Sequence, residues 1–233
     1  MVALLVVLTI VVFVAADAAV QWRKSKKEAA AREWADALAP AYAFEGMKAP
    51  AGVYLDEGHT WVQVSPLGRA DIGADSFAQR LIGRVDAVEL PEVGREVRRG
   101  DFLFALRQGD RRAAFAAPVD GVVSAVDKEL AWHPELVEAD PYQDGRVCSI
   151  NPKNLARDLR LLRVAEEGRD WLKEEVRRFH EFFAARPLQN TPLGQVLQDG
   201  GQPTGGVLEL LDDATWKEFN ELFLRPRAQG VPN

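Results

Sequence analysis

Residues 102–126 read FLFALRQGDRRAAFAAPVDGVVSAV, and this stretch decides the fold. Two apolar runs, FLFALR at 102–107 and AAFAA at 113–117, flank a charged turn. The turn contains Gly109-Asp110, a dipeptide suited to the positive backbone angles of a tight hairpin. Pro118 ends the second run, and the sequence then continues with another turn and a strand-like segment. The stretch therefore predicts a β-hairpin followed by a further strand.

The sequence before this hairpin has a similar short-strand pattern. Apolar and polar residues alternate in VYLDEGHTWVQVS at 53–65 and in RVDAVEL at 84–90, while DSFAQRLIG at 75–83 has helical spacing and ends at a glycine. Short strands separated by turns every 8–12 residues indicate a mainly-β sandwich or barrel.

Three further motifs make this region resemble the H protein of the glycine cleavage system. They are VELPEVG at 88–94, APVDGVV at 117–123 and PELVEADPY at 134–142, and the resemblance covers about residues 51–185. It implies a lipoyl-domain-like fold, a barrel-sandwich hybrid in which two small antiparallel sheets form a flattened barrel. It also implies flanking helices, one short at the edge of the barrel and one at its carboxy-terminal end.

The resemblance implies a carrier chemistry as well. The family binds lipoate through an amide bond to one lysine at a hairpin tip, and this arm shuttles an aminomethyl group between the decarboxylase, the aminomethyltransferase and the dihydrolipoyl dehydrogenase. The family tip reads approximately Glu-Ser-Val-Lys, then six residues, then Ala-Pro-Val. Counting back from residues 117–119 places Asp110 at the lysine position, and the three residues before it are replaced by Arg107, Gln108 and Gly109.

The residues at this tip cannot accept lipoate. Amide formation needs an amine that can lose a proton, which a carboxylate, a glycine and a guanidinium do not offer. A slip of the alignment by one residue reaches only Gly109 or Arg111, and no lysine occurs between Lys48 and Lys128. We therefore expect lipoate to be absent and the protein to have no active site of its own.

The tip is also basic, and two interpretations of its charge remain open. Asp110 is surrounded by Arg107, Gln108, Gly109, Arg111 and Arg112. One interpretation is a solvated turn whose exposed ion pairs contribute less than about 1 kcal/mol. The other is a contact patch for a protein partner or a lipid phosphate.

The carboxy-terminal part is predicted to be helical. Residues 154–163 and 169–184 have amphipathic patterns, and the second helix is expected to pack on the barrel. Residues 186–233 are predicted to form a linker and then an amphipathic helix, N-capped by Asp213 and running from 214 to 224. Its apolar stripe either docks on a partner or folds back on the domain, and comprises Trp216, Phe219, Leu222 and Phe223.

The amino-terminal part is predicted to be a single-pass membrane anchor over residues 1–22. The run from Val2 to Ala16 is unbroken apolar sequence, and fifteen helical residues reach about 22 Å. Continuing to Val20 approaches the roughly 30 Å of a hydrocarbon core. The basic stretch RKSKK at 23–27 predicts that the N-terminus lies outside and the domain on the cytoplasmic side, beyond a helical stalk and linker at 23–50. A cleaved signal peptide and a buried helix are the alternatives.

Composition excludes several other classes. The formal net charge of −6 argues against a nucleic-acid partner. One cysteine, Cys148, and three dispersed histidines argue against a disulfide framework or a metal site. We expect Cys148 and Trp61 to be buried and His59 to be structural.

These observations favour a membrane-anchored, non-lipoylated H-protein-like domain that serves as a non-catalytic scaffold or interaction subunit with unidentified protein partners. Two alternatives are an aminomethyl carrier of the glycine cleavage system and an accessory protein that binds a lipoylated partner.

Overall fold

Two antiparallel sheets organise the part of the chain that the computed structural model describes, which is residues 49–184 and 206–224 together with Asp17 and Gln21. Nearly all of the anchor predicted at 1–22 and of the stalk at 23–50 lies outside the described residues, as does most of the linker that follows residue 185. Among the described residues, no helix has the length and apolar character needed to cross a membrane.

The larger sheet has seven strands in the order β10-β1-β2-β3-β9-β8-β5. Its antiparallel register pairs Trp61 with Gly73 across β2 and β3, and Ala70 with Ile150 across β3 and β9. Its strands are β1 (Val53–Leu55), β2 (Thr60–Val64), β3 (Ala70–Ala74), β5 (Glu96–Val97), β8 (Gly121–Val126), β9 (Cys148–Pro152) and β10 (Arg163–Val164).

The smaller sheet contains the hairpin predicted from residues 102–126. Its strand order is β4-β6-β7, and its strands are β4 (Ala87–Glu89), β6 (Phe102–Gln108) and β7 (Arg111–Ala116). The sheets enclose a core that includes Trp61, Phe104 and Phe115, each at most 1% exposed. The predicted mainly-β fold with flanking helices is therefore confirmed.

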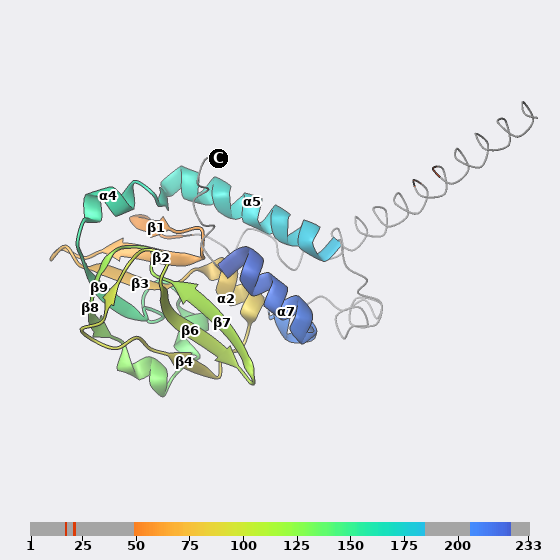
Figure 1. Ribbon diagram of the computed structural model, residues 1–233, viewed down its shortest axis with the longest axis horizontal. Coiled ribbons are helices and arrows are strands. Elements are labelled where there is room, and N and C mark those ends of the chain that lie inside the picture. Colours follow the sequence, from red (N-terminus) through yellow and green to blue (C-terminus); the bar gives the residue numbers. More distant parts are fainter. Residues whose placement is uncertain (1–16, 18–20, 22–48, 185–205, 225–233) are drawn as a thin grey trace, which may run out of the picture.

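Helices cover the outside of this β structure (Figure 1). In Figure 1, α5 runs along the side of β1 and β2, and α7 lies near α2 at the end where the hairpin closes. The helices and single turns are α2 (Ser76–Ile82), η2 (Lys128–Ala131), α3 (Leu136–Ala139), α4 (Leu155–Leu159), α5 (Ala165–Ala184), η3 (Val207–Leu210), α7 (Asp213–Phe219) and the π-helical turn η4 (Asn220–Leu224).

Local capping explains why α2 begins and ends where it does. The Asp75 carboxylate accepts a hydrogen bond from the Ala78 amide at the start of the helix. Gly83 ends it with a φ of 76°, and its amide donates to the Gln79 carbonyl. The predicted helix over this segment is thus confirmed.

The length predicted for the helix at residues 154–163 is wrong. Helix α4 ends at Leu159, because residues 163 and 164 form strand β10 and pair with β1. The second predicted helix begins earlier than expected, at Ala165, and includes the predicted range 169–184.

Five phenylalanine rings join the helices to one another. Phe77 of α2 and Phe179 of α5 have ring centroids 6.1 Å apart, and Phe219 lies 6.0 Å from Phe179 in an edge-to-face arrangement. Phe223 stacks on Phe219 at 4.9 Å and lies 5.6 Å from Phe182. We call these five residues the phenylalanine cluster, and all of them are buried.

The cluster distinguishes the two alternatives for the last helix, which folds back on its own domain. Trp216, Phe219 and Phe223 are buried against the chain's own domain, whereas Leu222 is 47% exposed. The helix folds back because α2 and α5 supply the apolar surface that its stripe needs. Its N-cap is Asp212, whose carboxylate accepts from the Thr215 amide, so the N-cap predicted at Asp213 is wrong by one residue.

Candidate functional site

The hairpin tip carries the residues that the sequence singles out. Gln108 of β6 pairs with Arg111 of β7, so Gly109 and Asp110 form the two-residue turn between them. Gly109 has a φ of 56°, and its amide donates to an Asp86 carboxylate oxygen at 2.8 Å. Asp110 is exposed. The position at which the family resemblance expects a lysine is therefore a solvent-facing aspartate at the turn.

Two of the tip arginines lie on the outward face of the small sheet. Arg107 and Arg112 are register partners, and both face Glu89 of β4. The Arg112 guanidinium donates to Glu89 at 2.8 Å and also lies over the Phe102 ring at 4.4 Å. Both arginine side chains are more than 40% exposed, so they remain accessible to a partner.

Arg111 has a different environment, because it is engaged by the C-terminal segment. Its guanidinium donates to the carbonyl oxygens of Leu208 and Leu211 and to the Asp213 carboxylate at 2.9 Å. It also lies over the Trp216 ring at 5.4 Å. The part of the predicted contact patch that involves Arg111 is thus occupied within the chain.

Gln108 is also held inside the molecule. Its side-chain amide donates to the Ile82 and Arg84 carbonyl oxygens, which fastens the hairpin to the end of α2. Of the predicted patch, Arg107 and Arg112, which share Glu89, therefore remain the exposed cationic groups.

A hollow of about 470 Å³ lies between the tip and the C-terminal segment. Four carboxylates and two guanidinium groups line it, and the Arg84 amide donates to Glu209 across it at 2.7 Å. No group of histidine, cysteine and acidic residues in the described part of the chain could hold a metal ion. The lining comprises Arg84, Asp86, Gln108, Gly109, Asp110, Arg111, Glu209 and Asp213.

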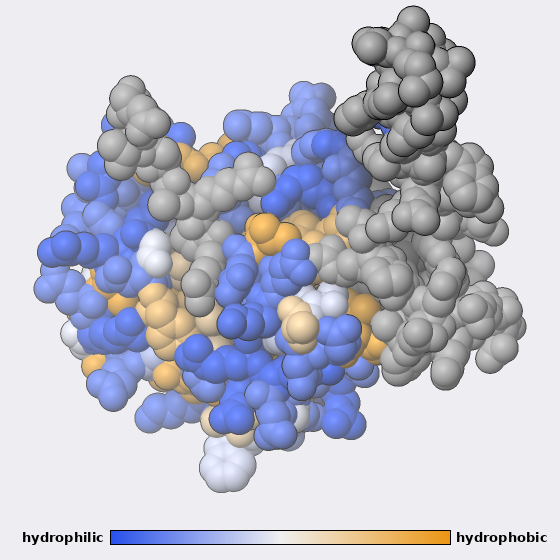
Figure 2. Space-filling model, turned by 45° about the vertical axis from the view of Figure 1, so that its right-hand side comes forward, coloured by the Kyte–Doolittle hydropathy of each residue, from blue (hydrophilic) through white to orange (hydrophobic). Residues whose placement is uncertain are grey.

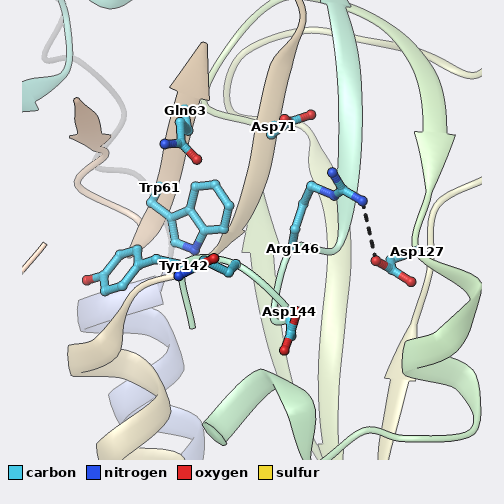
Figure 3. A pocket seen from close by; sticks show the side chains of 8 residues that line it. Trp61, Gln63, Asp71, Asp127, Tyr142, Asp144 and Arg146 are labelled. Carbon is cyan, nitrogen blue, oxygen red and sulfur yellow. Dashed lines mark hydrogen bonds and ion pairs between the residues drawn. The ribbon is translucent and has the colours of Figure 1, made fainter. Parts of the chain in front are cut away.

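A second hollow, of about 330 Å³, opens beside the larger sheet (Figure 3). Trp61 lies at its side and donates its indole N–H to the Pro141 carbonyl at 2.9 Å. Arg146 forms an ion pair with Asp127 at 3.5 Å, drawn as the dashed line in Figure 3. Asp71 accepts a hydrogen bond from the Ser149 hydroxyl. These side chains of the lining therefore have partners within the chain, and their positions are explained by the fold without a ligand.

Two groups near this hollow are unsuited to acid–base or nucleophilic chemistry. Burial, followed by the nearby Asp75 carboxylate, raises the pKa of the Tyr142 phenol. Burial, with a contribution from Asp71, raises the pKa of the Cys148 thiol to about 12. Cys148 is 1% exposed, so the prediction that it is buried is confirmed. Trp61 is buried as predicted.

His59 forms a buried clamp that the sequence pattern does not reveal. Its Nδ1 lies 2.8 Å from an Asp75 carboxylate oxygen, and its Nε2 lies 3.6 Å from a Glu175 oxygen on α5. The ring is stacked between Phe77 and Trp171, at centroid distances of 4.4 and 5.0 Å. His59 also adopts a φ of 58°, an uncommon conformation for a residue other than glycine. The predicted structural role of His59 is thus supported by these contacts.

The clamp keeps His59 protonated. Burial acts to lower the pKa of His59, but the charges of Asp75 and Glu175 and the hydrogen bond to Asp75 outweigh burial and raise the pKa to about 9. Glu175 is itself paired with Arg178. The imidazolium therefore connects the β1–β2 turn to both α2 and α5.

Hydrophilic residues predominate on the face shown in Figure 2, and hydrophobic residues are confined to small patches there.

A comparison with protein-family models matches the part of the chain that contains both sheets and the hairpin. The model of the family "Glycine cleavage H-protein" matches residues 53–175, which is more than half of the chain. The chain therefore belongs to the glycine cleavage H-protein family. The helix that ends at Leu224 lies beyond the matched range.

Named relatives give the same result. A "Probable glycine cleavage system H protein" of Pyrococcus horikoshii is 38% identical over 126 residues, which cover 54% of this chain and 93% of the relative. A "Glycine cleavage system H protein" of Aeromonas hydrophila is 36% identical over 101 residues, or 43% of this chain and 78% of the relative. A crystal structure of a glycine cleavage system H protein from Mycobacterium marinum is 22% identical, with a TM-score of 0.46, and the alignment covers 55% of this chain and 98% of that one.

The His59 clamp predicts how stability depends on pH. Because the pKa of His59 is raised on folding, its contribution is fully present below about pH 6.5 and is lost as the pH rises through about 9. Between pH 6.5 and 9.5 we expect the free energy of unfolding to fall by about 3 kcal/mol, as measured by urea denaturation. His59→Asn should flatten this dependence, since asparagine tolerates the positive φ but does not titrate.

The matched control for this prediction is His133→Gln, because His133 is exposed and paired only with Glu135. This variant should keep the pH dependence of the unmodified chain. An equal slope in the His59→Asn variant would show that another group causes it.

Proposed function

We propose that this chain is a non-lipoylated member of its family, and that it works as a membrane-anchored scaffold or interaction subunit without catalytic activity of its own. The observation that carries the proposal is the aspartate at the hairpin turn. Asp110 offers a carboxylate where attachment of lipoate requires an amine, so the tip has no group that a lipoate ligase could acylate.

A shift of the alignment by one residue would not bring a lysine to the hairpin turn. Only Gly109 and Asp110 lie between the paired residues Gln108 and Arg111. A shift along the turn therefore reaches glycine or arginine, neither of which forms a stable acyl adduct at neutral pH. Lys128 begins η2, after the end of β8, and so does not belong to the hairpin.

The names of the relatives favour a second candidate function. The proteins of Pyrococcus horikoshii and Aeromonas hydrophila are named as glycine cleavage system H proteins, a name that fits the aminomethyl carrier role. That role requires lipoate on this chain, and Asp110 argues against it. A third function, binding of a lipoylated partner, needs no modification of this chain and is compatible with the accessible arginines.

The accessible basic groups support an interaction role. Arg107 and Arg112 point outward from the small sheet beside the turn, and each has only one carboxylate, Glu89, to share. Guanidinium groups in such a pair bind external carboxylates or phosphates through bidentate hydrogen bonds. We assign them to contact with an acidic surface of a protein partner or with a lipid phosphate.

Lipoylation is tested by coexpressing the chain with a lipoate ligase and measuring its intact mass. We expect the unmodified mass for the wild-type chain, whereas a lipoyl-carrying H protein expressed in parallel should gain the adduct. Asp110→Lys is the matched variant, since it restores an amine at the turn. An adduct on the wild-type chain, at any residue, would favour the carrier role instead.

The membrane anchor is tested by deleting residues 1–22. The apolar run and the basic residues that follow it support an anchor with the domain on the cytoplasmic side. We expect the full chain to sediment with membranes and the shortened chain to remain in the supernatant after ultracentrifugation. Sedimentation of the shortened chain would count against a single anchor and would point to the basic tip as a second membrane contact.

A further inference from the structure

The last described segment, residues 206–224, packs against α2, β7 and α5; we call this segment the cap, and the surface that it covers the groove. Its first residue donates a backbone hydrogen bond to the Arg80 carbonyl of α2 at 2.8 Å, and Glu209 accepts from the Arg84 amide. Helix α7 and turn η4 then continue past the hairpin towards α5. The cap thus contacts all three elements that border the groove.

The groove has an apolar floor and a cationic end. The floor consists of Phe77 of α2 and Phe179 and Phe182 of α5, and the cationic end is Arg111 of β7. Arg178 adds a second cation at the far end, where its guanidinium lies over the Phe223 ring at 4.9 Å. A helix that binds this groove therefore needs a carboxylate near its N-terminus to meet Arg111, aromatic side chains along one face, and a free carbonyl oxygen near its C-terminus to meet Arg178.

The cap shows what such an occupant looks like. Trp216, Phe219 and Phe223 are spaced by three and four residues, so they lie on one helical face towards the groove. Asp213 at the start of the helix pairs with Arg111, and the Leu222 carbonyl at its end accepts from Arg178. This is the pattern by which an amphipathic helix binds a hydrophobic groove.

The fit between cap and groove is incomplete in one respect. For two buried polar atoms of the cap, Trp216 Nε1 and Asn220 Oδ1, the structure shows no hydrogen-bond partner among the described residues. A buried polar atom without a partner costs about 1–3 kcal/mol relative to its hydrated state. Release of the cap would return both atoms to water, which offsets part of the cost of exposing the aromatic rings.

We propose that this groove is a helix-binding surface, that the cap occupies it within the chain, and that an amphipathic helix of a partner protein displaces the cap. The partner helix carries aromatic residues at positions i, i+3 and i+7 and a carboxylate at position i−3. The charge of Arg111 selects the acidic residue, and the phenylalanine floor selects the aromatic face. This inference is independent of whether the hairpin tip carries lipoate.

Hydrogen exchange of the full chain tests whether the cap opens by itself. We expect the amides of residues 213–224 to exchange through a local opening, faster than the amides of β2, β3 and β9. Phe219→Ala should raise the exchange rates of the cap by at least about tenfold and leave those of the three strands unchanged. Leu222→Ala is the matched control, since this exposed side chain of the same segment should change neither set.

A labelled synthetic peptide with the sequence of residues 206–224 tests the groove as a binding surface, with fluorescence anisotropy as the measurement. The peptide should bind the full-length Phe219→Ala chain, whose own cap is weakened, and it should bind the Leu222→Ala chain at least about tenfold more weakly. A peptide in which Trp216 and Phe223 are replaced by alanine should not bind. Phe223→Leu, which removes one buried aromatic ring and keeps an apolar side chain, provides a milder opened chain if Phe219→Ala impairs folding.

Three results would overturn the proposal. The first is exchange of the cap amides only together with those of the strands, in the wild-type chain and in both opened variants. The second is failure of the peptide to bind an opened chain whose strand amides remain protected. The third is a dimer of the wild-type chain formed by exchange of caps, detected by light scattering, because a second copy would then be the occupant.

Discussion

The packing of the phenylalanine cluster is the interaction on which the arrangement of the helices depends. Phe77 belongs to the β domain through α2, Phe179 to α5, and Phe219 to the last helix, so one set of rings joins three segments far apart in sequence. Each fully buried ring contributes about 1.5–3 kcal/mol from the removal of apolar surface from water. The buried imidazolium of His59 adds a polar contact to α5 one turn before Phe179, through Glu175. Helix α5 is therefore held by an ionic and an aromatic contact on the same side.

The hairpin turn and its strands are held by polar contacts to Asp86 and Glu89. The backbone of the turn is held by the Asp86 carboxylate, and the strands beside it are joined by Glu89 and its two arginines. None of these contacts requires a lysine or a lipoyl arm. The domain exposes two surfaces to other proteins: the hairpin turn at Asp110 and the arginines beside it. The proposed interaction role would use these surfaces.

Local patterns in the sequence predict the local parts of this structure. The hairpin follows from Gly109-Asp110 between two apolar runs, and α2 follows from its helical spacing and the stop at Gly83. Burial of Trp61 and Cys148 follows from their positions in alternating strands. The family resemblance adds the barrel, because it carries information about long-range pairing that periodicity does not contain.

The contacts that define the candidate site join residues far apart in the sequence, and they could not be predicted from spacing. Arg111 meets the cap about a hundred residues further along the chain, and His59 reaches a carboxylate on α5. An apolar stripe such as that of α7 shows that a helix needs a partner surface, but it does not show whether that surface belongs to the same chain. The aromatic residues of α5 were the available signal, since they exceed what packing of a single helix on the barrel requires.

In the proposed function, this family member uses its β domain as a contact surface and not as a carrier. The most direct measurement is the lipoate content of the chain isolated from its own cells, determined by acid hydrolysis and mass spectrometry. We expect no lipoate to be released from the purified chain. One equivalent of lipoate per chain, in amide linkage to any of its residues, would contradict it.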